Sequence, residues 1–506
     1  MSDADQGLRG RRTSIELDPE DFRAIGHRLV DDIAGLLASM RERPLTSGEN
    51  GEQLRKLLGG DASLPDKGTD AGTLMREATD LLLDHSLYNG HPRFFGYITA
   101  GAAPIGMLGD LLAAAVNPNV GSFTLAPMAT EIEAQAVRWI ADLVGFPRDG
   151  DGVLVSGGNM ANMIGFWAAR AARASWDVRE HGMRAKSGGR DLRVYGSKGM
   201  HTWIQKAADL SGLGADSIRW VGTDGEGRID LRALRAQIEA DLESNAVPMM
   251  VVGTGGSVST GAVDPLPELR ELCDEYRTWL HVDGAYGAFA AAASKAPPEL
   301  RGLALADSVA LDPHKWLYAP LEVGCTLVRD PQALLDAFSY RPEYYHFSEE
   351  ARNYFEHGIQ NSRGFRALKV WLQLRQAGRE GYQRMIDEDI ELARRFHGIA
   401  LEHPELEAFT HALSITTYRF VPEDLTERNS EKEVSDYLNE LNQELQDRME
   451  KGGRAFVSNA VLEGTYALRM CIVNFRTGLE DVEALADVTV ELGRAIDEER
   501  RPESLR

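Results

Sequence analysis

The sequence predicts an α/β protein: a large domain with a mainly parallel mixed sheet, a smaller C-terminal α+β domain and an N-terminal helical arm. Between residues 91 and 329, short apolar runs alternate with longer stretches of helical periodicity. Many of the short runs are apolar throughout, which is typical of strands that are covered on both faces. Strands that alternate with helices indicate βαβ units, and therefore a mainly parallel sheet.

The first 85 residues predict the helical arm. Asp18 to Asp21 is typical of a helix start, because acidic side chains in the first turn interact favourably with the helix dipole. Apolar residues then recur at nearly helical spacing, at Phe22, Ile25, Leu29, Ile33 and Leu37. An isolated helix of this kind would expose its apolar face, so we expect residues 1–85 to lie on the main body or on a partner subunit.

The rest of the chain divides into two domains. We expect the large domain over residues 86–376, with strands at 153–156, 193–195, 217–221, 249–253, 279–282, 308–311 and 324–328. An amphipathic helix at 365–376 leads into the small domain, residues 377–506, with helices at 431–451 and 479–498 and strands near 415–420 and 466–473. A chain of 506 residues is too long for one simple core, so such a division is expected.

Composition and charge exclude several classes of protein. The net charge of −23, without a dense basic stripe, disfavours nucleic acid and anionic membranes as partners. The three cysteines are widely spaced and predict neither a disulfide framework nor a zinc site. No apolar run is long enough to span a bilayer, and the first 15 residues lack the apolar core of a signal peptide. We therefore expect a cytoplasmic protein.

Two charged residues follow predicted strands. Lys315 lies just after the strand at 308–311, between His314 and Trp316, where an unpaired ammonium is costly to bury. It is either a surface loop lysine or one that is neutral, paired or covalently used. Asp283 ends the strand at 279–282, at the edge where α/β sheets bind ligands, unless it only caps a helix or a turn. It shares a strand face with His281, but no further ligands lie nearby, so we expect no metal.

Two further segments supply an anion site and an imidazole. Residues 156–162 (SGGNMAN) follow a strand and open a helix, which leaves backbone N–H groups free to bind an anion. This segment fits neither the Walker pattern nor the GxGxxG pattern. His201 lies at the mouth of another βα turn, and a lone histidine there is more often structural. Together the four segments supply, in chain order, the parts of a pyridoxal 5′-phosphate (PLP) site: a phosphate cradle, a stacking ring, an acid and a lysine.

At this point the chain resembles a known family over essentially its whole length. It is similar to the group II PLP-dependent decarboxylases, the family of aromatic-L-amino-acid and glutamate decarboxylases. The matching segments are HPRFFGY at 91–97, NPNV at 117–120, TEIE at 130–133, HVDGAYG at 281–287, DPHKW at 312–316 and RGFRALK at 363–369. The resemblance implies the fold type I architecture of PLP-dependent transferases, PLP as the cofactor, and decarboxylation of an L-amino acid to an amine and CO₂.

The resemblance also implies roles for individual residues. Lys315 would form the Schiff base with PLP, Asp283 would keep the pyridine nitrogen protonated, and His201 would stack on the ring. Tyr344 would protonate the substrate carbon, although its neighbour Tyr345 is an alternative, and a tyrosine there favours amine formation over an oxidative outcome. The remaining cofactor contacts would come from Gly157, Gly158, Asn159, Ser257, Ala285 and His314. Substrate contacts would come from Phe95, Tyr97 and Arg363, with a flat, aromatic substrate slightly favoured.

Departures from the family pattern leave the substrate open. Residues 256–258 (GSV) replace a Thr-Thr pair, Asp312 replaces the asparagine of animal aromatic decarboxylases, and Ala100 replaces a threonine that contacts the substrate. A PLP enzyme of other chemistry is an alternative: an oxidative aldehyde synthase, a transaminase or another lyase. A silent, oligomeric binding protein is a more remote one. The resemblance further implies a homodimer in which residues 117–123 reach the neighbour's site.

Overall fold

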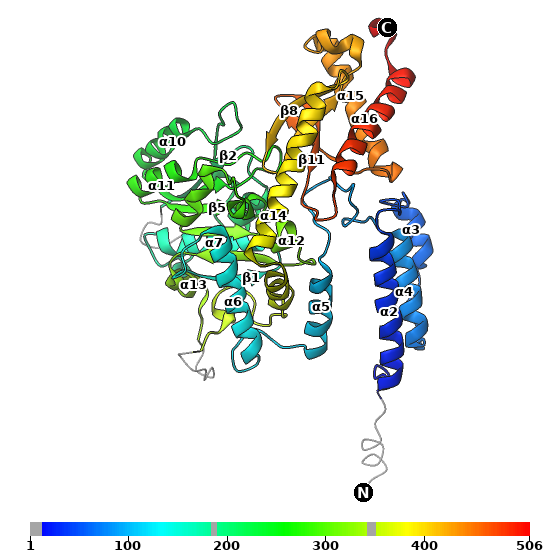
Figure 1. The fold of residues 1–506 in the computed structure, drawn as a ribbon. Coiled ribbons are helices and arrows are strands. Elements are labelled where there is room, and N and C mark those ends of the chain that lie inside the picture. The colour runs from blue at the N-terminus through cyan, green and yellow to red at the C-terminus, as the bar shows by residue number, and fades with distance from the viewer. Residues whose placement is uncertain (1–12, 184–189, 342–350) are drawn as a thin grey trace.

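The computed structural model describes residues 13–183, 190–341 and 351–506 (Figure 1). Most of the chain folds into a large domain around a seven-stranded sheet. A second, four-stranded sheet with long helices forms the C-terminal part, and a group of helices forms the N-terminal arm. The predicted fold class is confirmed.

The large sheet places its loops so that several converge at one edge. Its strands are β1 (Asp151–Val155), β2 (Leu192–Ser197), β3 (Ile218–Val221), β4 (Val247–Thr254), β5 (Trp279–Asp283), β6 (Ser308–Leu311) and β7 (Gly324–Val328), in the order β1-β7-β6-β5-β4-β2-β3. The pairs from β3 to β6 are parallel, whereas β7 runs antiparallel to both of its neighbours. The carboxyl ends of all strands except β7 therefore lie at the same edge.

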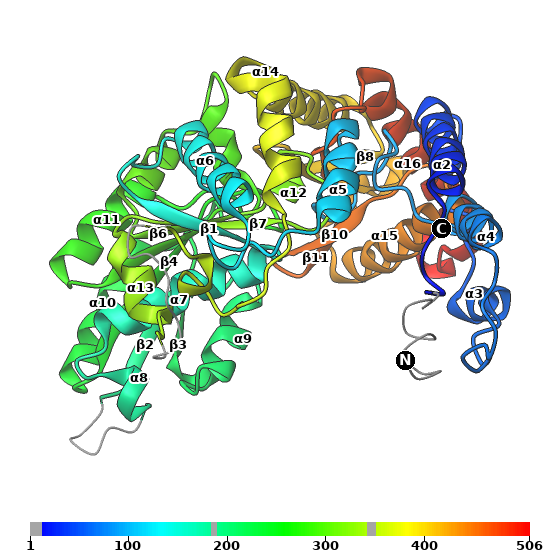
Figure 2. The ribbon, with the colours of Figure 1, turned by 90° about the horizontal axis from the view of Figure 1, so that it is seen from below.

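Helices cover both faces of this sheet, which explains why its strands are apolar throughout. One core includes residues of α6 (Pro127–Val144), α10 (Leu231–Glu243) and α11 (Leu266–Glu275). A separate core includes residues of α7 (Gly158–Arg173), α9 (Trp203–Leu210) and α13 (Pro331–Phe338). In Figure 2, α6 and α7 lie on opposite sides of the sheet. Strands buried on two faces need no polar alternation.

One long helix connects the two sheets. The helix α14 (Ala367–Glu402) contains a kink at Gly378, whose φ of 64° favours glycine. It leads into an antiparallel sheet of order β10-β11-β9-β8, formed by β8 (Leu406–Ala412), β9 (Ile415–Phe420), β10 (Ser458–Leu462) and β11 (Thr465–Cys471). This sheet packs with α15 (Lys432–Gly452) and α16 (Leu479–Arg500) around a third core.

The N-terminal arm consists of α2 (Pro19–Ser39), α3 (Gly51–Leu58) and α4 (Ala71–His85). The first helix begins where predicted, since the Asp18 side chain accepts a hydrogen bond of 2.8 Å from the Glu20 backbone N–H. The arm extends away from the large domain (Figure 1) and none of its helices contains a buried residue. Its base is held by an ion pair between Arg41 and Asp481 at 2.8 Å.

Apolar side chains remain exposed along this side of the chain. In the arm they are Phe22, Val30, Leu74 and Leu82. A second group lies on α5 (Pro104–Val116), whose exposed residues Leu108, Leu111, Leu112 and Val116 form what we term the α5 strip. The arm was expected to lie on the main body or on a partner subunit. The main body covers little of its surface. Within the described ranges, no helix has the length and apolar character needed to cross a membrane.

Candidate active site

A cavity of about 530 Å³ opens at the edge where the parallel strands end. The turns after β1, β2, β4, β5 and β6 all contribute to its wall. The residues that line it include Ser156, Gly157, Gly158, Asn159, Met163, His201, Thr254, Asp283, Ala285, Tyr286, Asp312, His314 and Lys315. The four segments singled out in the sequence therefore meet in one place, although they are spread over about 160 residues of chain.

Lys315 lies in the short helix α12 (Pro313–Trp316), directly after β6. Its Nζ is 3.1 Å from Oδ2 of Asp312, and its side chain is only 20% exposed. The other oxygen of Asp312, Oδ1, is buried and has no hydrogen-bond partner among the described residues. A buried polar atom of this kind normally has a partner, so this corner of the cavity has room for another polar group.

Asp283 brings a carboxylate to the same cavity from the end of β5. It is 8% exposed and accepts hydrogen bonds from Trp203 Nε1 at 2.7 Å and from the Ala285 N–H at 3.2 Å. No cationic side chain of the described residues forms an ion pair with it. Burial of an uncompensated carboxylate is costly, so the site is complementary to a positively charged or protonated group of a ligand.

His201 stands at the mouth of the cavity. Its Nδ1 accepts a hydrogen bond from the Trp203 backbone N–H at 3.3 Å, which leaves the ring proton of the neutral form on Nε2. Partial burial lowers the pKa of His201, the charge of Asp283 opposes this shift, and that of Lys315 adds to it. The imidazole is therefore mainly neutral at pH 7.

Glycines make the close approach at the first turn of α7 possible. Gly157 has a φ of 125°, a conformation that side chains rarely tolerate. A Cβ on Gly158 would lie 2.5 Å from Asp312 Oδ2, and one on Gly324 would lie 2.7 Å from the Gly157 Cα. The N-terminus of α7 therefore faces the cavity with unencumbered backbone N–H groups, which suits an anion such as a phosphate.

The cavity fits PLP by these observations. The phosphate suits the first turn of α7, the protonated ring nitrogen suits Asp283, and the aldehyde suits Lys315. Ala285 and His314 also line the cavity; the His314 Nδ1 donates to the Val323 carbonyl at 2.7 Å, which fixes its ring.

Ser257, expected from the sequence to contact the cofactor, does not line the cavity, and one residue that does line it was missed. The Ser257 Oγ lies 2.9 Å from Thr260 Oγ1 and closes its own turn, and Ser257 does not line the cavity. Thr254 lines it instead, at the end of β4. The position of Thr254 at a strand end was the signal that could have found it. Trp203, which holds Asp283, was missed as well, although it follows His201 by two residues.

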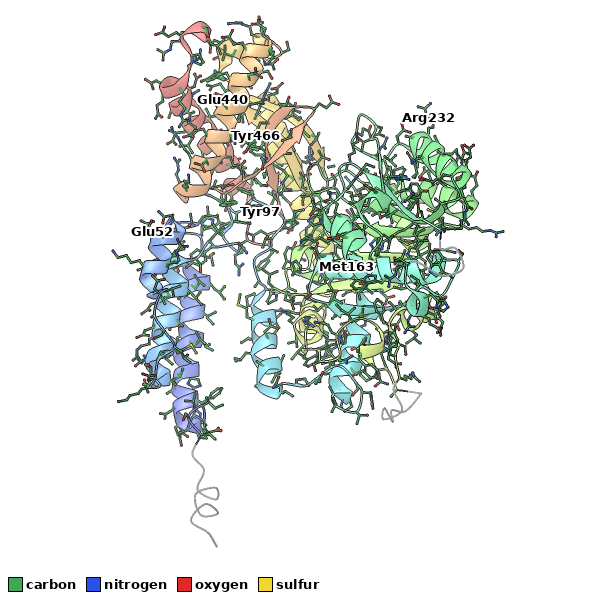
Figure 3. The ribbon with its side chains drawn as sticks, turned by 180° about the vertical axis from the view of Figure 1, so that it is seen from behind. Glu52, Tyr97, Met163, Arg232, Glu440 and Tyr466 are labelled. Atoms are coloured by element: carbon green, nitrogen blue, oxygen red, sulfur yellow. The ribbon has the colours of Figure 1, made fainter. Side chains whose placement is uncertain are left out.

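The expected substrate residues are not gathered at the cavity. Phe95 is fully buried in the core of the C-terminal part, whereas its neighbour Phe94 stacks on Phe456, so the two rings point to different sides. Tyr97 is 58% exposed and does not line the cavity; in Figure 3 it lies beside the small domain, whereas Met163 of the cavity wall lies in the large domain. Tyr344 and Tyr345 fall outside the described residues.

Arg363 lies in a buried network instead of the cavity. Its guanidinium donates to the Val120 carbonyl at 2.9 Å and to Glu133 Oε2 at 3.1 Å, and both charged side chains are almost fully buried. These contacts saturate the group that was expected to orient the substrate. Their physical role is to join the 117–123 loop and α6 to the segment that precedes α14.

Known proteins resemble this chain over most of its length. The family model described as the pyridoxal-dependent decarboxylase conserved domain matches residues 52–416. An aromatic-L-amino-acid decarboxylase of Bacillus atrophaeus is 32% identical over 474 residues, which cover 93% of this chain and 95% of the relative. A phenylacetaldehyde synthase of a Rosa hybrid cultivar is 29% identical over 480 residues, 92% of each chain. The crystal structure of Oryza sativa TDC with PLP and tryptamine has a TM-score of 0.87 at 25% identity, and covers 96% of this chain and 100% of that one.

Proposed function

Since the chain belongs to the pyridoxal-dependent decarboxylase family, and is thereby a PLP-dependent amino-acid carboxy-lyase, we propose that its substrate is an aromatic L-amino acid. The products would be CO₂ and the corresponding amine. The observation that carries the PLP chemistry is the meeting of Lys315, the uncompensated carboxylate of Asp283 and the first turn of α7 in one cavity. The aromatic preference is supported by the activities of the similar proteins, an aromatic-L-amino-acid decarboxylase and a phenylacetaldehyde synthase.

Three side chains would hold and tune the cofactor. Lys315 would hold PLP covalently through Nζ, which requires that it leave its ion pair with Asp312. Asp283 would keep a proton on the pyridine nitrogen through a charge-assisted hydrogen bond, and Trp203 would keep that carboxylate in place. PLP supplies the sink for the electron pair that remains when CO₂ leaves.

The turns around the cavity would supply the phosphate contacts and the side chain that covers the ring. Gly157, Gly158 and Asn159 would bind the phosphate at the start of α7, with Ala285 and His314 beside it. His201 would cover the ring at the mouth of the cavity as a mainly neutral imidazole. Exclusion of water at this mouth favours loss of a charged carboxylate as neutral CO₂.

The final proton would come from Tyr344, with Tyr345 as its alternative. Proton delivery to the substrate carbon gives an amine, whereas a site without that acid would favour an aldehyde. The similarity to a phenylacetaldehyde synthase makes aldehyde formation the second candidate function. The tyrosine at position 344 favours the amine.

We also propose that the protein is a cytoplasmic homodimer with domains at 1–85, 86–376 and 377–506. The arm and the α5 strip leave apolar side chains exposed that a second copy would cover. The three cysteines are free and buried, which is compatible with a reducing compartment.

The decisive experiment is a substrate panel with product identification. Purified protein loaded with PLP is incubated with tyrosine, tryptophan, dopa, phenylalanine, histidine, glutamate, aspartate and diaminobutyrate. CO₂ release is measured together with the amine or the aldehyde by mass spectrometry. Amine from an aromatic substrate is expected; CO₂ only from acidic substrates would overturn the proposed substrate class, and aldehyde would establish the second candidate. Borohydride reduction should fix the cofactor to Lys315.

A further inference from the structure

A buried carboxylate lies directly behind the turn that carries Lys315. Asp389, on α14, is 3% exposed. Its Oδ2 accepts hydrogen bonds from Trp316 Nε1 at 2.8 Å and from the Tyr318 hydroxyl at 2.9 Å. These donors follow Lys315 by one and three residues. A single oxygen atom therefore anchors two points of the short stretch of chain directly after the lysine.

Simple packing does not explain this aspartate. No cationic side chain of the described residues forms an ion pair with it, and burial raises the pKa of Asp389 to about 7. The nearby Tyr318, Tyr382 and Cys471 are uncharged at that pH, because burial raises the pKa of each group. An apolar side chain of similar volume would fill the space without the cost of burying a carboxyl group. The carboxyl group therefore has a role that depends on accepting hydrogen bonds.

The turn that it anchors has little stability of its own. The helix α12 is four residues long, and the side chain of its N-cap residue, Asp312, makes no capping hydrogen bond. A helix this short is not stable without tertiary contacts. Tyr318 then adopts a φ of 56°, which is uncommon for a residue with a side chain. External anchors must therefore fix the orientation of this turn, and with it the base of the Lys315 side chain.

The same anchors connect to the wall of the cavity. The Trp316 ring stacks on Tyr286, with centroids 5.1 Å apart and an interplanar angle of 11°. Tyr286 lines the cavity, and its hydroxyl lies 2.7 Å from Ser414 Oγ in the small domain. A shift of Trp316 would therefore move both the lysine turn and one wall of the site.

We propose that Asp389 is a positioning residue for the reaction: its hydrogen bonds to Trp316 and Tyr318 fix the turn that holds Lys315. The inference deepens the proposed function, because it rests on the role proposed there for Lys315. Asp389 contacts neither the cavity nor any group that would react. Loss of its two hydrogen bonds would shift the reacting amine relative to Asp283, and small misplacements of this kind lower turnover strongly.

The test compares variants of the full-length enzyme loaded with PLP. Asp389→Ala removes both acceptors, Asp389→Asn retains an acceptor oxygen, and Tyr318→Phe removes one donor but retains the ring. Asp241→Ala is the control, because Asp241 is also buried and accepts from the Tyr195 hydroxyl at 3.0 Å, at the other end of the sheet, although it also pairs with Arg219 at 2.8 Å. For each variant, kcat and KM, the visible absorbance of bound PLP, and the Kd for PLP are measured.

We expect Asp389→Ala to lower kcat on the order of 10-fold or more with KM changed less than about two-fold. Its visible absorbance should shift, and its Kd for PLP should rise. Asp389→Asn should restore most of the turnover, and Tyr318→Phe should show a smaller loss in the same direction. If Asp389→Ala does not fold, the Tyr318→Phe result carries the test by itself.

Asp241→Ala should lower the melting temperature while leaving kcat, absorbance and the Kd for PLP close to those of the wild type. The inference is overturned if the Asp389 and Tyr318 variants lose only melting temperature, as the control does. The absorbance and the Kd for PLP do not depend on which substrate is used. A failure of the proposed substrate class is thus distinguishable from a failure of this inference.

Discussion

Among the described residues, the cavity at the sheet edge contains polar groups without partners, whereas the arm and the α5 strip contain apolar side chains without cover. In the cavity, the Asp312 Oδ1 has no hydrogen-bond partner and the charge of Asp283 no cationic partner within the part of the chain that the structure describes. On the arm and the α5 strip, apolar side chains lack cover. Unpartnered polar atoms in a concave site indicate a small polar ligand, whereas an uncovered apolar surface indicates another protein surface. The first region therefore suits the cofactor, and the second suits the second copy that we propose.

The strongest way to break the first half of this comparison is to remove the lysine. Lys315→Ala should reduce kcat by at least about 1,000-fold, because no other lysine among the described residues lines the cavity. Borohydride should then fix no cofactor to the protein, as mass spectrometry of the intact chain can check. Lys295→Ala, at an exposed position, is the control and should retain both activity and fixation. Covalent fixation in Lys315→Ala would place the cofactor on another residue.

Removing only a charge sharpens the same point. Asp283→Asn keeps the shape of the side chain and an oxygen that can accept from Trp203. It no longer compensates a protonated ring nitrogen, so we expect kcat to fall on the order of 100-fold, with a weaker Kd for PLP. Steady-state kinetics and fluorescence titration with PLP measure the two effects. Unchanged kcat would mean that the charge of Asp283 serves folding alone.

Asp389 differs from both regions, because this buried carboxyl group has its hydrogen-bond donors, Trp316 and Tyr318, within the protein. The pKa of an aspartate is about 3.9 in an unfolded chain, and burial raises that of Asp389 to about 7. Its favourable contribution to stability is therefore complete below about pH 4 and is lost as the pH rises through 7. At most this amounts to about 4 kcal/mol.

Urea unfolding of the wild type and of Asp389→Asn at pH 5 and pH 8 tests this sign. The free energy of unfolding of the wild type should fall relative to that of the variant as the pH rises, by up to a few kcal/mol. Asp436→Asn, which removes an exposed carboxylate from α15, should show no such trend. A wild type that gains stability relative to Asp389→Asn at pH 8 would contradict the assignment.

The apolar half of the comparison is tested on the α5 strip. Leu108→Asp combined with Leu112→Asp places two charges one helical turn apart on the exposed face of α5. Each leucine buried at an interface contributes about 1.5–3 kcal/mol, so the dimer dissociation constant should rise by at least about 10-fold. Light scattering over a range of concentrations measures it, and Leu242→Asp, at a 40% exposed position of α10, is the control outside the arm and the α5 strip. A wild type of monomeric mass at micromolar concentration would refute the dimer.

The sequence predicts the cavity better than it predicts the substrate side, and the reason is physical. Lys315, Asp283, His201 and Gly158 each follow a strand, and parallel strands bring their ends to one edge whatever the details of packing. The position of Arg363 depends instead on Glu133, 230 residues away, and this buried ion pair leaves no local pattern in the sequence.

The direction of a side chain is likewise hard to predict from the sequence where the chain forms no regular helix or strand. Phe94 and Phe95 are adjacent phenylalanines in different environments. Phe94 stacks on Phe456, whereas Phe95 lies in the third core. The sequence shows two adjacent aromatic residues, but not which ring faces which side. The fold class survives such errors because it depends on periodicity over whole elements.

The smallest expected effect separates two neighbouring hydroxyl groups at the end of β4. Ser257 was expected to contact the cofactor, but its Oγ is engaged with Thr260 at 2.9 Å, whereas Thr254 lines the cavity. Ser257→Ala should therefore change the Kd for PLP by less than about two-fold, and Thr254→Val, which keeps the shape of the side chain, should weaken it more, by about two- to ten-fold. Both constants follow from fluorescence titration of the apoenzyme with PLP. The reverse order would mean that the turn at 257–260 opens when the cofactor binds, and that the hydroxyl expected from the sequence reaches it after all.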